Sequence, residues 1–150
     1  MNLSRLLIPA LVCTVATLSA QDPKAKAQAL VREAIAFAKK SGKEALVKET
    51  NNSLGRFHVQ SGETAYIFIY DMQGLCIGMG FQSKAVGTNR WDTKDPDGKL
   101  YVREFLNTVK TKGNGWVEYK KPNPKTNKLE QKASYVEGLD GWVIGCGAYK

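Results

Sequence analysis

The segment Tyr66-Ile67-Phe68-Ile69-Tyr70-Asp71 alternates aromatic and aliphatic residues, so that both of its sides are apolar. Successive side chains of a strand point to opposite sides of a sheet. A strand that is apolar on both sides belongs in the middle of a sheet and is covered on both faces. The segment therefore predicts a central strand with one packed layer above it and another below it.

The residues before this strand predict two helices. Asp22 fits the N-cap of a helix, because its carboxylate can accept hydrogen bonds from the free backbone N–H groups of the first turn. Pro23 fits the first helical position, where the backbone N–H that proline lacks would have no partner within the helix. Apolar residues at helical spacing continue to Lys39-Lys40, and Gly42 is a typical helix stop. A shorter helix is expected over residues 43–49. Together they form an amphipathic layer for one face of the sheet.

The second half of the chain predicts one more helix and four more strands. Asp97 can cap a helix over residues 99–112, and glycines follow it. Strand-like runs occupy residues 75–80, 115–120, 132–137 and 141–150. Asp140-Gly141 is a two-residue hairpin signal. We therefore expect an α+β fold whose last three strands form an antiparallel meander.

Residues 1–20 are typical of a secretory signal peptide. Arg5 precedes a mostly apolar stretch over residues 6–18, which is too short to cross a bilayer, and Ser19-Ala20 offers small residues before polar Gln21. A chain of 150 residues is long enough for one domain with a core and too short for two of typical size. We expect cleavage near Ala20, a single domain over residues 21–150, and a periplasmic or secreted protein.

The charge of the chain is strongly basic, with a formal net charge of +8. The lysines are spread along the sequence and form no basic block, which indicates a solvated lysine-rich surface. Export removes nucleic acid from the expected partners.

The sequence contains few of the residues that enzymes use. His58 is the only histidine and lies in a polar stretch, and no serine elbow, metalloprotease motif or phosphate-binding loop occurs. We therefore expect no catalytic residues and no cofactor. One calcium-loop-like pattern runs through Thr93, Asp95, Asp97, Gly98 and Glu104, but threonine replaces its first acidic ligand. The preferred interpretation is that Asp97 caps the helix and Gly98 turns the chain, with no metal bound.

Glycine pairs and aromatic residues indicate a place for a small molecule. Gly145 and Gly147 lie two apart on one side of the last strand, and Gly78 and Gly80 do so on the second strand. Such pairs leave room for a ligand or for close backbone packing, and the sequence leaves both possibilities open. The candidate ligand-binding residues are Phe68, Trp91, Trp116, Tyr119, Lys132 and Tyr135, with Tyr149 as a further wall. Aromatic walls and one ammonium would suit a small carboxylate, although regular strand alternation places Lys132 and Tyr135 on opposite faces.

Several stretches carry a family resemblance when taken in order. They are Gly55-Arg56-Phe57, residues 66–74, Val86-Gly87-Thr88-Asn89, residues 95–99, residues 113–117, Pro122-Asn123-Pro124, residues 132–136 and residues 145–149. Together they resemble a single Cache domain, the extracytoplasmic small-molecule sensor module. The resemblance implies a PAS-like five-stranded antiparallel sheet of order 2-1-5-4-3. It further implies a long N-terminal helix on one face, and an inserted helix and loops over the ligand on the other.

The resemblance implies a sensor and not an enzyme. Since no membrane helix or output domain follows in the sequence, we expect a stand-alone binding protein for a small metabolite, a carboxylate by preference, that presents its bound state to a membrane receptor or transporter. The alternative is a protein-interaction module with no physiological small ligand. In the implied strand order, Cys76 and Cys146 are separated by another strand, which is too far for a disulfide, although the oxidising compartment favours pairing.

Overall fold

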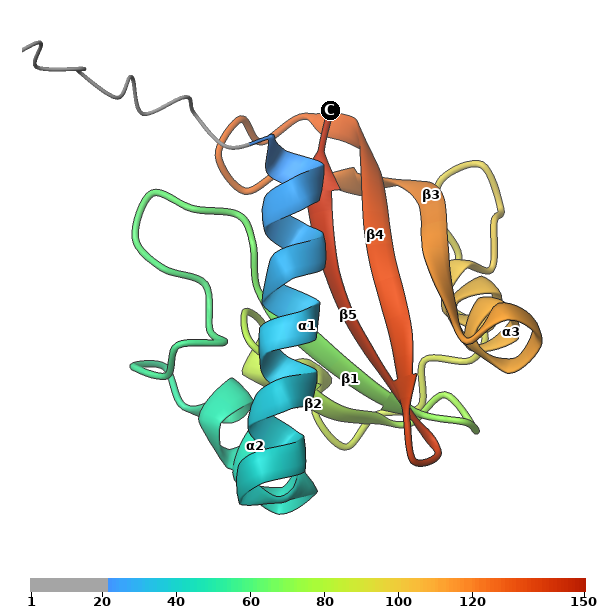
Figure 1. The fold of residues 1–150 in the computed structure, drawn as a ribbon. Coiled ribbons are helices and arrows are strands. Elements are labelled where there is room, and N and C mark those ends of the chain that lie inside the picture. Colours follow the sequence, from blue (N-terminus) through green and yellow to red (C-terminus); the bar gives the residue numbers. More distant parts are fainter. Residues whose placement is uncertain (1–21) are drawn as a thin grey trace, which may run out of the picture.

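The computed structural model describes residues 22–150, which form one antiparallel sheet with helices on both faces (Figure 1). The predicted signal peptide lies outside the described residues. The elements in chain order are α1 (Pro23–Ser41), α2 (Lys43–Asn51), β1 (Ile67–Asp71), β2 (Cys76–Met79), the short 3-10 helix η1 (Ser83–Ala85), α3 (Tyr101–Lys112), β3 (Asn114–Pro122), β4 (Leu129–Leu139) and β5 (Trp142–Tyr149).

The strand order is β2-β1-β5-β4-β3, as the family resemblance implied. β1 pairs with β2 on one side and with β5 on the other, which confirms that the apolar segment is central. β3, β4 and β5 form the expected antiparallel meander. Asp140 and Gly141 join β4 to β5 with φ values of 43° and 80°, the geometry that a tight two-residue hairpin requires.

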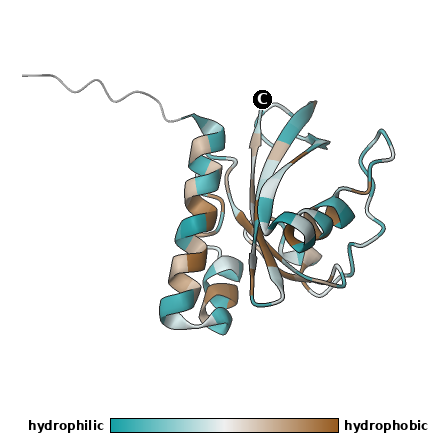
Figure 2. Ribbon diagram, turned by 45° about the vertical axis from the view of Figure 1, so that its right-hand side comes forward, coloured by the Kyte–Doolittle hydropathy of each residue, from teal (hydrophilic) through white to brown (hydrophobic). Residues whose placement is uncertain are grey.

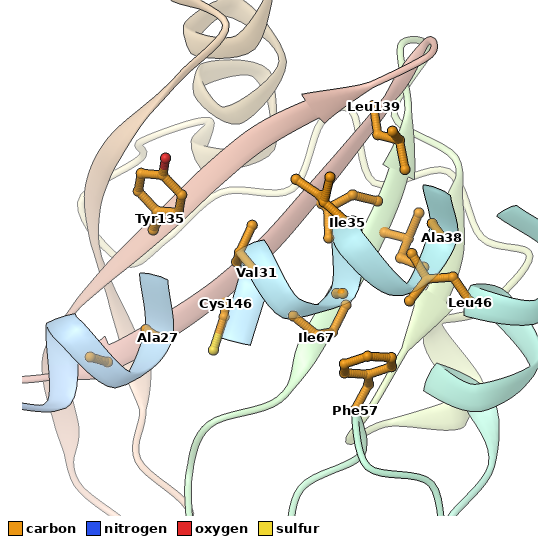
Figure 3. Close-up of a cluster of buried hydrophobic side chains, with 14 residues drawn as sticks. Ala27, Val31, Ile35, Ala38, Leu46, Phe57, Ile67, Tyr135, Leu139 and Cys146 are labelled. Carbon is orange, nitrogen blue, oxygen red and sulfur yellow. The ribbon is translucent and has the colours of Figure 1, made fainter. Parts of the chain in front are cut away.

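α1 and α2 cover one face of the sheet, and α3 lies against the other (Figure 2). The Asp22 side chain accepts from the backbone N–H of Lys24 at 3.3 Å, so the predicted cap is confirmed. Gly42 separates the two helices with φ of 96°, which favours glycine. The residues of α1 that turn toward the sheet are buried, and Figure 3 shows them packed with side chains of β1 and β5. We call this side of the sheet the α1 face.

The start of α3 differs from the prediction. The helix begins at Tyr101, and neither Asp97 nor any other side chain caps it. The carboxylate of Asp95 instead accepts from the backbone N–H groups of Asp97, Lys99 and Lys120 at 2.9–3.0 Å. The predicted cap at Asp97 is therefore wrong, because Asp95 organises this turn and ties it to β3. Both of its oxygens accept hydrogen bonds from backbone N–H groups.

Cys76 and Cys146 are both buried and both free. They lie on β2 and β5 with β1 between them, and they belong to the cores of opposite faces. The prediction of two unpaired thiols agrees with this arrangement. None of the helices within residues 22–150 combines the length and the apolarity needed to cross a membrane.

Candidate functional site

The face of the sheet opposite α1 carries the polar residues that could hold a ligand, and we call it the ligand face. Strand alternation directs Phe68 of β1 and the glycines and Tyr149 of β5 to this face. The same alternation brings Tyr119 with Lys121 from β3, and Lys132 with Ser134 from β4. Tyr66, just before β1, completes the set.

Lys132 is the most unusual residue of this face. Its side chain is 1% exposed, and its ammonium group donates one hydrogen bond, to the hydroxyl of Tyr66 at 3.3 Å. The nitrogen also lies 4.7 Å from the ring centroids of Tyr66 and Tyr149. Burial lowers the pKa of Lys132 to about 8, because the charged amine has lost its water and has no anion beside it. A buried charge without a partner is costly, so this position calls for an explanation.

Two further cations converge on the same region. Burial lowers the pKa of Lys121, and the neighbouring charges of Lys132 and Arg90 lower it further. Arg90 comes from the loop between η1 and α3, and its Nε is buried without a hydrogen-bond partner. Among residues 22–150, the ion pairs involve other side chains, and none of them neutralises Arg90, Lys121 or Lys132. The region is therefore a positive pocket that lacks its own counter-ion.

Two adjoining hollows open beside these cations. The smaller has a volume of about 210 Å³ and is lined by Tyr66, Lys121 and Tyr149, among others. The larger, of about 490 Å³, is lined by the residues of η1 and by Arg90. Phe81 and Gln82 line both, and Phe81 stacks on Tyr66 with ring centroids 5.4 Å apart. Lys132 lines neither hollow itself, and it adjoins the smaller one through Tyr66, to which its amine donates.

Aromatic stacking fixes α3 against the ligand face. Tyr101 stacks on Tyr119 at 4.4 Å, and Phe105 stacks on Phe68 at 5.2 Å. The hydroxyl of Tyr119 lies 3.0 Å from the hydroxyl of Ser134, so that both buried groups are satisfied. Burial raises the pKa of Tyr119 well above its ordinary value, so this hydroxyl stays neutral. The walls of the site are thereby held rigid.

The glycine pairs serve close packing in this structure. A Cβ at Gly147 would lie 2.2 Å from Cε of Lys132, and one at Gly145 would lie 2.2 Å from the ring of Phe68. A Cβ at Gly78 would meet the side chain of Ile69, and one at Gly80 the carbonyl of Phe57. Of the two possibilities, close approach is the one observed. Gly147 matters for the site because it makes room for the aliphatic stem of Lys132.

The structure brings together only half of the predicted site residues. Phe68, Tyr119 and Lys132 share the ligand face. Trp116 and Tyr135 lie on the α1 face, where their rings pack 5.4 Å apart. The expectation that Tyr135 shares a pocket with Lys132 fails because β4 pairs regularly with both neighbours, so the two side chains keep to opposite faces.

Trp91 also lies away from the buried cations. It is 38% exposed and borders a separate groove on the outer side of α3. The residues that sequence reasoning missed are Tyr66, Arg90 and Lys121. Strand alternation predicts Lys121, because it lies two residues after Tyr119 and therefore on the same face of β3, and Tyr119 pairs with Lys132 of β4. Arg90 lies in an irregular loop, where no periodicity marks it.

The comparisons with known proteins agree with this architecture. Residues 14–150 match the single Cache domain 2 family. A stretch of 90 residues, 59% of the chain, is 39% identical to the sensor histidine kinase MctS of Rhizobium johnstonii, and this match spans 19% of the kinase. The chain therefore accounts for only about a fifth of that relative's length.

Solved sensor domains share the fold. A periplasmic sensor domain of a chemotaxis protein is 25% identical, with a TM-score of 0.64 over 83% of this chain and 88% of that one. A methyl-accepting chemotaxis protein of Vibrio parahaemolyticus, 23% identical, has a TM-score of 0.70 over 84% and 87%. A Cache chemosensory domain described for its carboxylic acid recognition is 26% identical, with a TM-score of 0.67 over 84% and 92%. With its sheet order, its two covered faces and a family match over most of its length, the chain belongs to the single Cache domain 2 family.

Proposed function

We propose that this protein is a periplasmic sensor or binding protein for a small organic acid, and that it relays its bound state to a membrane partner. Cache domains are extracytoplasmic sensor modules and not catalysts. The finer proposal concerns the ligand and its position. The ligand carboxylate would lie among Lys132, Lys121 and Arg90, with Phe81 and the tyrosines enclosing its carbon chain.

The observation that carries the proposal is the absence of a counter-ion around these three cations within the described residues. Lys132 is buried and unpaired, Lys121 has a lowered pKa, and Arg90 leaves a buried donor unused. An anion that entered between them would accept charge-assisted hydrogen bonds and would restore the charged form of Lys132. A neutral ligand would leave the same groups uncompensated.

The size of the hollow supports a small ligand. The hollow beside Tyr66 and Lys121 has a volume of about 210 Å³, below the roughly 300–1,000 Å³ that holds drug-sized molecules, and the adjoining hollow at Arg90 adds about 490 Å³. The similarity to a Cache domain described for carboxylic acid recognition supports the same chemical class. The relay to a membrane partner rests on the similarity to chemotaxis and kinase sensors.

A thermal-shift screen with matched pairs of ligands tests the proposal. Each small carboxylic acid is compared with its primary amide, which has nearly the same shape and no charge. We expect one or more acids to raise the melting temperature in a saturable way and their amides to have no effect. If no acid stabilises the protein in the absence of any partner, the proposal fails and an interaction module without a small ligand is favoured.

A further inference from the structure

A second feature of the molecule lies outside the ligand face and is an exposed, firmly held tryptophan. The side chain of Trp91 is 38% exposed. Its backbone N–H donates to the side chain of Asn89 at 2.9 Å, and its carbonyl accepts from Nε of Arg103 at 3.2 Å. Gly74 packs so closely that a Cβ there would lie 3.1 Å from the backbone of Trp91. The aromatic ring is therefore presented to solvent from a fixed backbone.

Trp91 borders a groove of about 440 Å³ between α3 and the turn that joins β1 to β2. Met72 and Leu106 line it together with the tryptophan. Leu75, next to Gly74 in the same turn, is 37% exposed. Tryptophan and methionine are enriched in protein interfaces, and an apolar side chain that enters such a groove displaces water from both surfaces.

The rim of the groove is positive. Arg103 lies over the ring of Trp91 at 5.1 Å and pairs with Asp92, whereas Lys110 is exposed and takes part in none of the ion pairs within residues 22–150. Asn107 adds a hydrogen-bonding side chain. An apolar groove with a cationic rim is complementary to an apolar side chain that has carboxylates beside it.

We propose that this groove is a docking surface for a partner protein, and that the docked segment carries an aromatic or aliphatic side chain flanked by aspartate or glutamate. The rigid backbone around Trp91 supports this role, because a preformed surface loses little conformational entropy on binding. The surface is separate from the buried cations, so its test does not depend on the proposed organic-acid site.

The test uses a random peptide library displayed on phage and selected on the protein. Selection is carried out against wild type with counter-selection on Lys110→Glu, an exposed charge reversal that does not disturb the core. We expect the enriched peptides to share an apolar residue with an acidic neighbour. Failure to enrich any sequence, or a consensus that is basic or lacks acidic residues, would overturn the proposal.

Binding of the consensus peptide is then measured by fluorescence anisotropy across variants. Trp91→Ala is expected to weaken it about thirtyfold, the loss typical of a central aromatic residue. Lys110→Glu is expected to weaken it about threefold to tenfold. Lys112→Glu is the matched control, because it changes the same charge on an exposed position of the same helix outside the groove, and it should have no effect. Equal losses in the two lysine variants would mean general charge attraction and would refute the docking surface.

Discussion

The α1 face and the ligand face are two sides of one sheet, yet they bury different chemistry. On the α1 face, a mostly apolar core that includes the alanines of α1 packs around Ile67 and Ile144. The ligand face buries tyrosines, a serine and the amine of Lys132. The first set gains stability mainly from apolar burial, whereas the second includes the buried amine of Lys132, which forms no ion pair among residues 22–150. The contrast separates the residues that maintain the fold from those that we assign to binding.

The largest expected effect comes from the α1 face. Ile144→Ala removes a fully buried side chain from the middle of β5 and should lower the free energy of unfolding by about 2–5 kcal/mol. Its side chain points away from the hollow, so the affinity for an organic acid should not change while the protein is folded. Urea denaturation and calorimetric titration at low temperature measure the two quantities. A large loss of affinity without a loss of stability would contradict the division between the faces.

Lys132→Met should have the opposite effect on stability. The methionine fills a similar space without a buried charge, and the lowered pKa of Lys132 to about 8 corresponds to a cost of about 2–4 kcal/mol in the empty protein. Replacing Lys132 also removes its hydrogen bond to Tyr66, which lowers the stability of the variant by about 1 kcal/mol and offsets part of the gain. We therefore expect denaturation at pH 7 to show a net stabilisation of about 1–3 kcal/mol. Destabilisation by a similar amount would make Lys132 a structural residue.

The stabilising effect of Lys132→Met should depend on pH. The pKa of Lys132 is about 8 in the folded protein and near its ordinary 10.5 in the unfolded chain. Between these values the unfolded chain binds more protons, so the wild type gains stability as pH rises. The stability advantage of Lys132→Met should be full below pH 8 and should fall as the pH rises toward 10.5, where only the loss of about 1 kcal/mol from the missing hydrogen bond to Tyr66 remains. Taking the difference cancels the contribution of the Cys76 thiol, whose raised pKa of about 11 acts in the opposite direction. A difference that stays constant across this range would mean that the buried amine does not titrate.

The smallest effect is expected for the two thiols, one in each core. Cys76 and Cys146 are free, so a reductant should leave the free energy of unfolding unchanged. Thiol titration of the unfolded, unreduced monomer should find two reactive groups. Finding none would require a disulfide across the sheet and would contradict the strand order.

The sequence predicts those parts of the fold whose signals are local. The cap at Asp22, the hairpin at Asp140-Gly141 and the alternation of β1 lie within a few residues of the elements that they define, and the structure confirms all three. The site is less predictable because it is assembled from distant segments. Arg90 reaches the ligand face only because its loop is bonded to β2, where the backbone N–H of Cys76 donates to the carbonyl of Thr88 at 3.0 Å.

The local sequence pattern predicts the wrong residue where two aspartates could cap the same helix. Asp97 stands at a plausible capping distance from α3, but Asp95 binds the free amides of the turn and the N–H of Lys120 on β3. That contact joins residues 25 positions apart, which a local pattern does not reveal. Residue type alone groups Trp116 and Tyr135 with Lys132, but their side chains lie on the opposite face of the sheet.

The central claim is that a carboxylate binds beside Lys132, Lys121 and Arg90, and calorimetric titration at pH 7 tests it most directly. The most stabilising acid of the screen and its amide are titrated into wild type and into Lys132→Met. We expect the acid to bind wild type, the amide to bind at least tenfold more weakly, and Lys132→Met to lose about tenfold to a hundredfold in affinity for the acid, as the loss of a charged hydrogen bond implies. Equal affinity of acid and amide, or an unchanged affinity in Lys132→Met, would contradict the account.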